Sequence, residues 1–262
     1  MAFSSKLYPG ELIVDHSTNS DVTHVNEYGR GYDSEKSLFG KFGSPASAFP
    51  RELLLSDNDI MSIVQETEER GSRLSDLILQ ANLVSKDQKQ TNYCWANAPA
   101  HCLEIERMLQ GQEYVDLSAA SVAAPINNYR NQGGAGTDAI KYMSDIGIAP
   151  VSMWPTNAID RRYYTQAMLE RSKLYRTTEW WELRTLQEKF SYLALRRGAT
   201  SVGYPWWSHE VSSIEPVVLD GELASRDRNN WGMGYSYKGF MIIRGSRMNF
   251  DECIAPAVMV AS

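Results

Sequence analysis

Cysteine, histidine and long apolar runs are all scarce in this sequence. Its 262 residues include three cysteines and four histidines. A small, odd number of cysteines argues against a disulfide framework and favours a reducing compartment. No stretch approaches the ~20 consecutive apolar residues of a membrane span, and the first twelve residues lack the apolar core of a secretory signal. We therefore expect no membrane span, no secretion through a signal peptide, and a cytoplasmic or particle-associated protein.

An excess of basic residues is also missing. The chain has 26 Lys and Arg against 32 Asp and Glu, a net charge of −6, and it contains no basic run. An acidic chain without such a run is a poor nucleic-acid binder, so we expect no nucleic-acid partner. No Cys or His pair has the spacing of metal ligands, which argues against a metal site. With 43% hydrophobic residues, a chain of this length can bury a sizeable core without such staples.

The first 50 residues differ in composition from the rest. They are rich in Gly, Ser, Asn and Asp, and the segments 28–32 and 40–50 are typical of loops. Ser56, with Asp59 three residues later, predicts a capping box that begins a helix ending near Gly71. We expect residues 1–73 to form an irregular N-terminal arm with one short helix. We also expect residues 1–50 to lie outside the core.

Residues 74–262 combine helical and stranded patterns. A short helix is predicted near 74–81, and apolar residues spaced by three and four predict helices over 94–109 and 137–146, with one or two more within 160–197. Short β-prone runs follow at 200–204, 210–218, 238–243 and 257–260. We expect an α+β protein with a mainly helical lobe (74–159), a mainly β lobe (160–262) and a cleft between them.

Cys94 is the best-placed nucleophile in the sequence. It stands at the start of the predicted 94–109 helix, where the helix dipole and free N–H groups stabilise a thiolate, so we expect a low pKa. A cysteine nucleophile also needs a base. His101 lies seven residues further on, ~10 Å along a helix, and cannot reach it. Because His16 and His24 belong to the arm, His209 remains as the base.

The residues around Cys94 resemble the nucleophile segment of papain-like cysteine peptidases. Gln88 stands six residues before Cys94, and Cys94-Trp95-Ala96 matches the family's Cys-Trp-Ala. Further blocks follow in the family's order, and the resemblance runs from about Leu83 to Val260. They are Leu117-Ser118, Gly133-Gly134, Gly147-Ile148, Trp154-Pro155, Ser208-His209-Glu210-Val211, Asn229-Asn230-Trp231-Gly232, Gly239-Phe240 and Cys253-Ile254-Ala255.

The resemblance implies a papain-like two-lobe fold with an antiparallel, barrel-like β lobe, and a cysteine peptidase without a cofactor. Cys94 would be the nucleophile and His209 its general base. Asn229, rather than Asn230, would orient the imidazole, since alternate strand residues share a face. The Gln88 amide and the Cys94 N–H would form the oxyanion hole.

The resemblance also implies a substrate cleft for a peptide or protein. Gly133 and Gly134 would let the substrate backbone approach and pair with the chain. Trp231 would contribute to the cleft and shield the bond between His209 and the asparagine from water.

Several positions depart from the family pattern, and they keep two other interpretations open. Thr91-Asn92-Tyr93 replaces the usual Cys-Gly-Ser, and Glu210 stands where a small residue is usual. With the long arm, these departures favour a structural or assembly protein of papain fold, such as a virion protein, whose site is weakened or idle and whose arm embeds it in a larger assembly. Acyl transfer is a third interpretation, although such families usually orient the histidine with Asp.

Overall fold

The structure, a computed structural model, describes residues 3–18, 27–41, 46–196 and 198–257. Helices and strands are mixed along the chain, which confirms the α+β prediction. The helices are α1 (Asp57–Glu69), α2 (Leu74–Gln80), α3 (Cys94–Leu109), α4 (Ala120–Ile126), α5 (Gly136–Asp145), α6 (Gln166–Ser172) and α7 (Leu186–Arg196). The strands are β1 (Leu12–Val14), β2 (Ala46–Ala48), β3 (Glu179–Glu182), β4 (Thr200–Tyr204), β5 (His209–Leu219), β6 (Glu222–Arg228), β7 (Phe240–Ile243) and β8 (Glu252–Ala257).

The helix boundaries follow the local signals of the sequence. Ser56 caps α1, and it forms the predicted capping box with Asp59. The structure confirms the helix predicted over 94–109, and Gly111 follows it with φ +70°. A left-handed conformation after a helix suits glycine, which has no Cβ to clash. Gly147, with φ +100°, follows α5 in the same way.

The strands form one eight-stranded sheet in the order β1-β7-β6-β5-β4-β8-β3-β2. The inner pairings, from β7 across to β3, are all antiparallel. The two outer strands, β1 and β2, instead pair in parallel with β7 and β3. Both outer strands come from the first 50 residues, which are otherwise mostly irregular.

The N-terminal arm is therefore part of the folded body. Val14 and Phe49 are buried in the core beside the sheet, and Tyr32 is buried in the core of the helical half. The expectation that residues 1–50 lie outside the core is wrong for these positions. Their apolar residues are scattered singly, so no periodic pattern signals the contacts that bury them.

Besides β1 and β2 of the arm, two strands of the sheet were not predicted. β3 lies within the segment expected to be helical, and β6 carries the buried charged residues Arg226, Asp227 and Arg228. Ion pairs make this burial possible, since Arg226 bonds Glu11 at 2.7 Å and also Glu215. The last strand ends at Ala257 in the described chain, and most of the predicted 257–260 strand lies outside the described residues.

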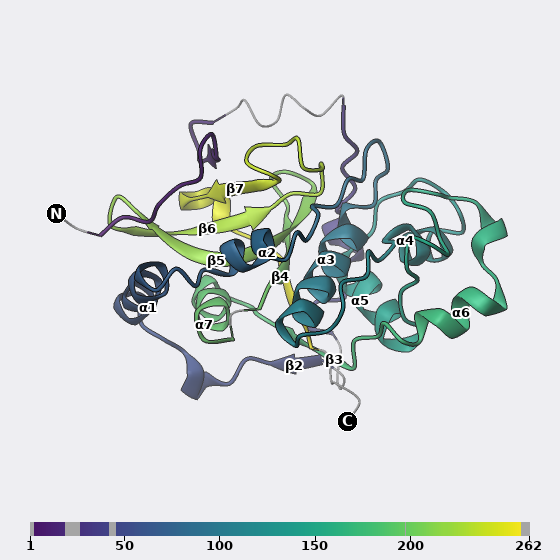
Figure 1. Cartoon of the computed structure of the whole chain (residues 1–262), viewed down its shortest axis with the longest axis horizontal. Coiled ribbons are helices and arrows are strands. Elements are labelled where there is room, and N and C mark those ends of the chain that lie inside the picture. Colours follow the sequence, from purple (N-terminus) through teal and green to yellow (C-terminus); the bar gives the residue numbers. More distant parts are fainter. Residues whose placement is uncertain (1–2, 19–26, 42–45, 197, 258–262) are drawn as a thin grey trace.

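The helical half and the sheet meet along α3. Figure 1 shows α3 to α6 on one side of the molecule and α1 and α7 below the sheet on the other. α3 packs against β4, β5 and β8. Met168 and Tyr175, from the segment assigned to the β lobe, pack instead with the helical half. The first residue of α3 is Cys94 and the first residue of β5 is His209, so the junction brings these two ends together.

Candidate active site

Cys94 lies at the junction of the two halves and has no exposed surface. Its sulfur accepts a hydrogen bond from the backbone N–H of Gly31 at 3.2 Å. The N–H groups of Trp95 and Glu210 also act on this sulfur and lower its pKa. Because Glu210 directly follows His209, the sulfur lies at the start of β5.

His209 is oriented by an asparagine on the neighbouring chain segment. Its Nε2 lies 2.8 Å from Oδ1 of Asn229, while its Nδ1 has no hydrogen-bond partner. The side chain of Asn230 donates instead to the carbonyl of Glu210 at 2.7 Å. The two asparagines therefore make different contacts, and Nδ1 is the ring nitrogen left to accept a proton.

Aromatic rings cover the His209 imidazole. The ring centroids of Trp207 and Trp231 lie 4.8 Å and 4.9 Å from it. Tyr28, from the N-terminal arm, stacks on Trp231 with centroids 5.1 Å apart. Rings this close exclude water from the bond between the imidazole and its asparagine, which strengthens that bond.

Gln88 lies beside the nucleophile and is fully buried. Its backbone N–H donates to the carbonyl of Asn230 at 2.8 Å, which ties it to the sheet half. Its side-chain amide donates to the carbonyls of Gly29 and Thr91, each at 2.8 Å. Both of its bonds thus go to peptide carbonyls, one of them in the N-terminal arm.

Gly134 pairs with the N-terminal arm in both directions. Its N–H donates to the carbonyl of Gly31 at 2.9 Å, and its carbonyl accepts from the N–H of Asp33 at 2.9 Å. These bonds make a parallel bridge to Tyr32. The carbonyl of Gly133 accepts from the Lys36 ammonium at 2.9 Å.

Residues 28–33 thus run across the whole site, and we call them the covering segment. In Figure 1 the purple trace that follows the first grey stretch descends toward α3. Its glycines allow the close approach. A Cβ on Gly29 would lie 2.1 Å from the carbonyl oxygen of Thr91, and one on Gly31 would lie 2.1 Å from that of Asn92. Only residues without side chains fit at these two positions.

No protein-family model matches the sequence, and no curated protein matches it. Solved structures do match. Procathepsin B from Trypanosoma congolense superposes with a TM-score of 0.60 at 16% identity, covering 87% of this chain and 86% of that chain. A digestive procathepsin L from Tenebrio molitor gives 0.56 at 18% identity, over 67% of this chain and 66% of that chain, slightly less than two thirds of its length. Xylellain, a cysteine protease from Xylella fastidiosa, gives 0.55 at 17% identity, over 68% and 84%.

The chain has the papain-like fold. At these identities the likeness establishes the fold and leaves the activity to the site itself.

Burial shifts the pKa values of Cys94 and His209 in opposite directions. It raises the pKa of Cys94 to about 12, and the charge of Glu210 adds to the effect. Burial also lowers the pKa of His209 to about 3, against the opposing bond from Asn229 and with a contribution from Arg30. The low thiol pKa expected from the sequence is therefore wrong for this covered form. The helix terminus favours a thiolate, but desolvation outweighs it.

The structure gathers the residues that the papain-like motifs single out. Gln88, Cys94 and Gly134 all bond the covering segment, while His209 bonds Asn229 and lies beside Trp231. His101 lies elsewhere, buried between Glu104 and Arg228 at 3.2 Å from each. Of the arm histidines, His24 lies outside the described residues.

The covering segment is the part of the site that sequence reasoning missed. The run Tyr28-Gly29-Arg30-Gly31-Tyr32 was interpreted as a loop. Its signal was the alternation of glycine with large side chains, which suits a strand-like segment whose backbone lies against another backbone. Nothing local in the sequence indicates which backbone it approaches.

Within the described residues, no group of three or more His, Cys, Asp or Glu is placed to bind a metal ion. None of the helices there is long and apolar enough to cross a membrane. The three cysteines are free and buried.

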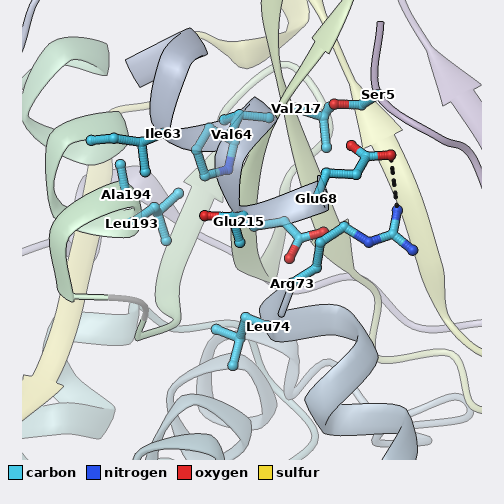
Figure 2. Close-up of a pocket in the computed structure, with 12 residues that line it drawn as sticks. Ser5, Ile63, Val64, Glu68, Arg73, Leu74, Leu193, Ala194, Glu215 and Val217 are labelled. Atoms are coloured by element: carbon cyan, nitrogen blue, oxygen red, sulfur yellow. Dashed lines mark ion pairs between the residues drawn. The ribbon is translucent and has the colours of Figure 1, made fainter. Parts of the chain in front are cut away.

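A separate, small pocket lies between α1, α7 and β5. Figure 2 shows apolar side chains, among them Ile63, Val64 and Leu193, on one side of it. The ion pair between Glu68 and Arg73, 3.8 Å apart, lies on the other side. None of the predicted site residues lines this pocket, so it is distinct from the papain-like site.

Proposed function

We propose that this chain is a papain-like cysteine peptidase whose cleft is covered by its own N-terminal arm, and that its substrate is a peptide or protein. One observation carries the proposal. Gln88, Cys94 and Gly134 each bond the backbone of the covering segment, at 2.8 Å, 3.2 Å and 2.9 Å. The three groups that a peptidase would use to hold a substrate backbone thus hold a peptide backbone here.

The same geometry supports a thiol mechanism once the segment leaves. His209 takes the Cys94 proton on Nδ1, and the sulfur attacks the substrate carbonyl carbon. The Gln88 amide stabilises the oxyanion, a contribution of ~2.7–4 kcal/mol for one donor of this kind. The imidazolium gives its proton to the leaving amine, which leaves a thioester on Cys94. Water then attacks the thioester with His209 as base and releases the acid.

The covering segment is held in an unreactive arrangement. The Cys94 sulfur accepts from the N–H of Gly31, so an amide proton, rather than a carbonyl carbon, lies on the side from which it would attack. Arg30 anchors the segment by donating to the carbonyl of Trp207 at 3.1 Å. The neutral thiol and neutral imidazole in this form are a further reason for low reactivity.

Hydrolysis by a released form tests this proposal. Gly31→Ala places a Cβ against Asn92 and should displace the covering segment. We expect this full-length variant to cleave a mixture of fluorogenic peptides at least tenfold faster than the unaltered chain. Adding Cys94→Ala should abolish the cleavage. Equal rates with and without the cysteine would contradict the proposal.

A second candidate function is an assembly protein of papain fold with an idle site. The complete burial of Cys94 and the outer strands β1 and β2 supplied by the arm favour it. It predicts that Gly31→Ala exposes Cys94 to alkylation and yet cleaves no peptide. Cys94 is not in a disulfide, which fits a reducing compartment or a particle. We propose a cytoplasmic or particle-associated location for the chain under either function.

A further inference from the structure

Another cavity lies at the far end of α3 from Cys94. It has a volume of about 280 Å³, close to the ~300 Å³ at which small-molecule pockets begin. Glu106, in the last turn of α3, lines it. Because Glu106 stands twelve residues after Cys94, ~18 Å further along the helix, this cavity is separate from the papain-like site. It also shares none of its described lining residues with the pocket of Figure 2.

Three polar side chains line the cavity, those of Glu106 on α3 and of Tyr192 and Arg196 on α7. None of the three forms a hydrogen bond or an ion pair with another described residue. A Cβ on Gly198 would lie 2.1 Å from Oε1 of Glu106 and 3.3 Å from the hydroxyl oxygen of Tyr192, so the carboxylate and the phenol lie close together. Tyr192 is 3% exposed, whereas Arg196 is an exposed residue, which places the guanidinium at the mouth of the cavity.

The environment of Glu106 favours a positively charged ligand. Burial raises the pKa of its carboxyl to about 7, against the opposing charge of Arg196, so the ionised form is poorly solvated. Glu106 belongs to the last turn of α3, and α7 ends at Arg196. Each helix C-terminus adds a partial negative charge. An ammonium group beside Glu106 therefore meets a carboxylate and the negative ends of two helices.

Apolar groups complete the walls of the cavity. Trp181 of β3, Leu195 of α7 and Pro256 of β8 contribute them. The rings of Trp181 and Tyr192 both pack against Phe49, with centroids 6.3 Å and 6.4 Å from it, which fixes their positions. Aromatic faces attract ammonium groups, and the aliphatic groups suit an apolar side chain.

We propose that this cavity binds a free α-amino acid with an apolar side chain. The ammonium group of the ligand donates to the Glu106 carboxylate and the Tyr192 hydroxyl. The carboxylate of the ligand accepts from the guanidinium of Arg196, whose planar fork matches it. The side chain of the ligand packs against Trp181 and Leu195. The bonds between charged partners are roughly twice as strong as neutral ones.

Both charges of the amino acid are needed for this fit. A carboxylic acid without an ammonium group would place a second negative charge near Glu106, which is unfavourable. An amine without a carboxylate would bond Glu106 but leave the Arg196 guanidinium unused. Inside a peptide chain both charged groups are replaced by amides, so the cavity binds the free amino acid in preference to a peptide interior.

Titrating the unaltered full-length chain with L-leucine, followed by ligand-detected NMR, tests the proposal without any need for turnover. We expect saturable binding with a dissociation constant of about 1 mM or lower. Two analogues each lack one charge, 4-methylpentanoate the ammonium group and 3-methylbutylamine the carboxylate. Each should bind at least about tenfold more weakly, because it loses one charge-assisted contact. No saturation by L-leucine at about 10 mM, or equal binding of all three compounds, would overturn the proposal.

Two substitutions assign the two charges to their partners in the same titration. In Glu106→Gln the preference for L-leucine over 4-methylpentanoate should disappear, and in Arg196→Gln the preference for L-leucine over 3-methylbutylamine should disappear. Arg162→Gln is the matched control, since this exposed residue lies outside the cavity, and it should keep both preferences. Unchanged preferences in the two cavity variants would place the binding elsewhere and overturn the proposal. Should Glu106→Gln fail to fold, Arg196→Gln and the analogue series decide in the same way.

Discussion

Gly31 lies against the chain that leads into α3 and donates to the Cys94 sulfur, which makes Gly31→Ala an informative single change. The new Cβ would lie 2.1 Å from the carbonyl oxygen of Asn92, and 2.7 Å from its Cβ. The obstacle is mainly backbone at the start of α3, which cannot move aside as a flexible side chain would. The segment must therefore shift away from the cleft.

The bonds lost in that shift set the size of the effect. The bonds nearest Gly31 are its own N–H to Cys94 at 3.2 Å and the two bonds with Gly134 at 2.9 Å each. At about 1 kcal/mol for each net hydrogen bond, the covered form loses about 3 kcal/mol. Since 1.4 kcal/mol is a factor of ten, the uncovered population should rise about 100-fold.

Alkylation of Cys94 by iodoacetamide, followed by mass spectrometry of the intact protein, measures that population. We expect Gly31→Ala to react about 100-fold faster than the unaltered chain at pH 8. Gly234→Ala is the matched control, since a Cβ there meets nothing within 4 Å, and it should react at the original rate. Equal rates for Gly31→Ala and the unaltered chain would show that the covering segment is no barrier.

Three further predictions can be tested separately. In an uncovered background, Asn229→Ala should lower hydrolysis more than Asn230→Ala, because only Asn229 bonds the His209 ring; equal losses would refute this geometry. Burial raises the pKa of the Glu252 carboxyl from its ordinary 4.5 to about 7. The stabilisation of the fold by the protonated carboxyl is therefore complete below pH ~4.5 and is lost as the pH rises through 7. Chemical denaturation between pH 5 and 8 should show a loss of at most ~3 kcal/mol, and Glu252→Gln should lose less; identical pH profiles would contradict this. Ser56→Ala should cost about 1 kcal/mol in the same assay by removing the α1 cap, and no change would mean that the capping box contributes nothing.

Most of the helices, though not α4, and the strands β4, β5 and β7 could be predicted because their signals are local. The capping box at Ser56 and the apolar spacing of α3 depend only on neighbours in sequence. The stranded region after residue 198 showed β-prone runs between Pro and Gly. β6 was missed because Arg226 and Arg228 are typical of exposed loops, and only distant acceptors such as Glu11 make their burial possible.

Some parts of the candidate site could likewise be predicted from the sequence, and others could not. The motifs around Cys94, His209 and Asn229 carried their resemblance in short runs of sequence. The covering segment did not, because its role depends on contacts between residues more than 50 positions apart, such as Gly29 with Gln88. The cavity beside Glu106 is likewise visible only once the fold brings α3, α7 and the end of β8 together.

Trapping an acyl group on Cys94 tests the central claim most directly. The Gly31→Ala variant is mixed with an activated ester of a short peptide, quenched in acid and weighed by intact-protein mass spectrometry. We predict one added acyl mass, mapped to Cys94 after digestion and missing when His209→Ala is also present. An iodoacetamide-reactive Cys94 that takes up no acyl group would contradict the claim that this covered cleft is a peptidase site.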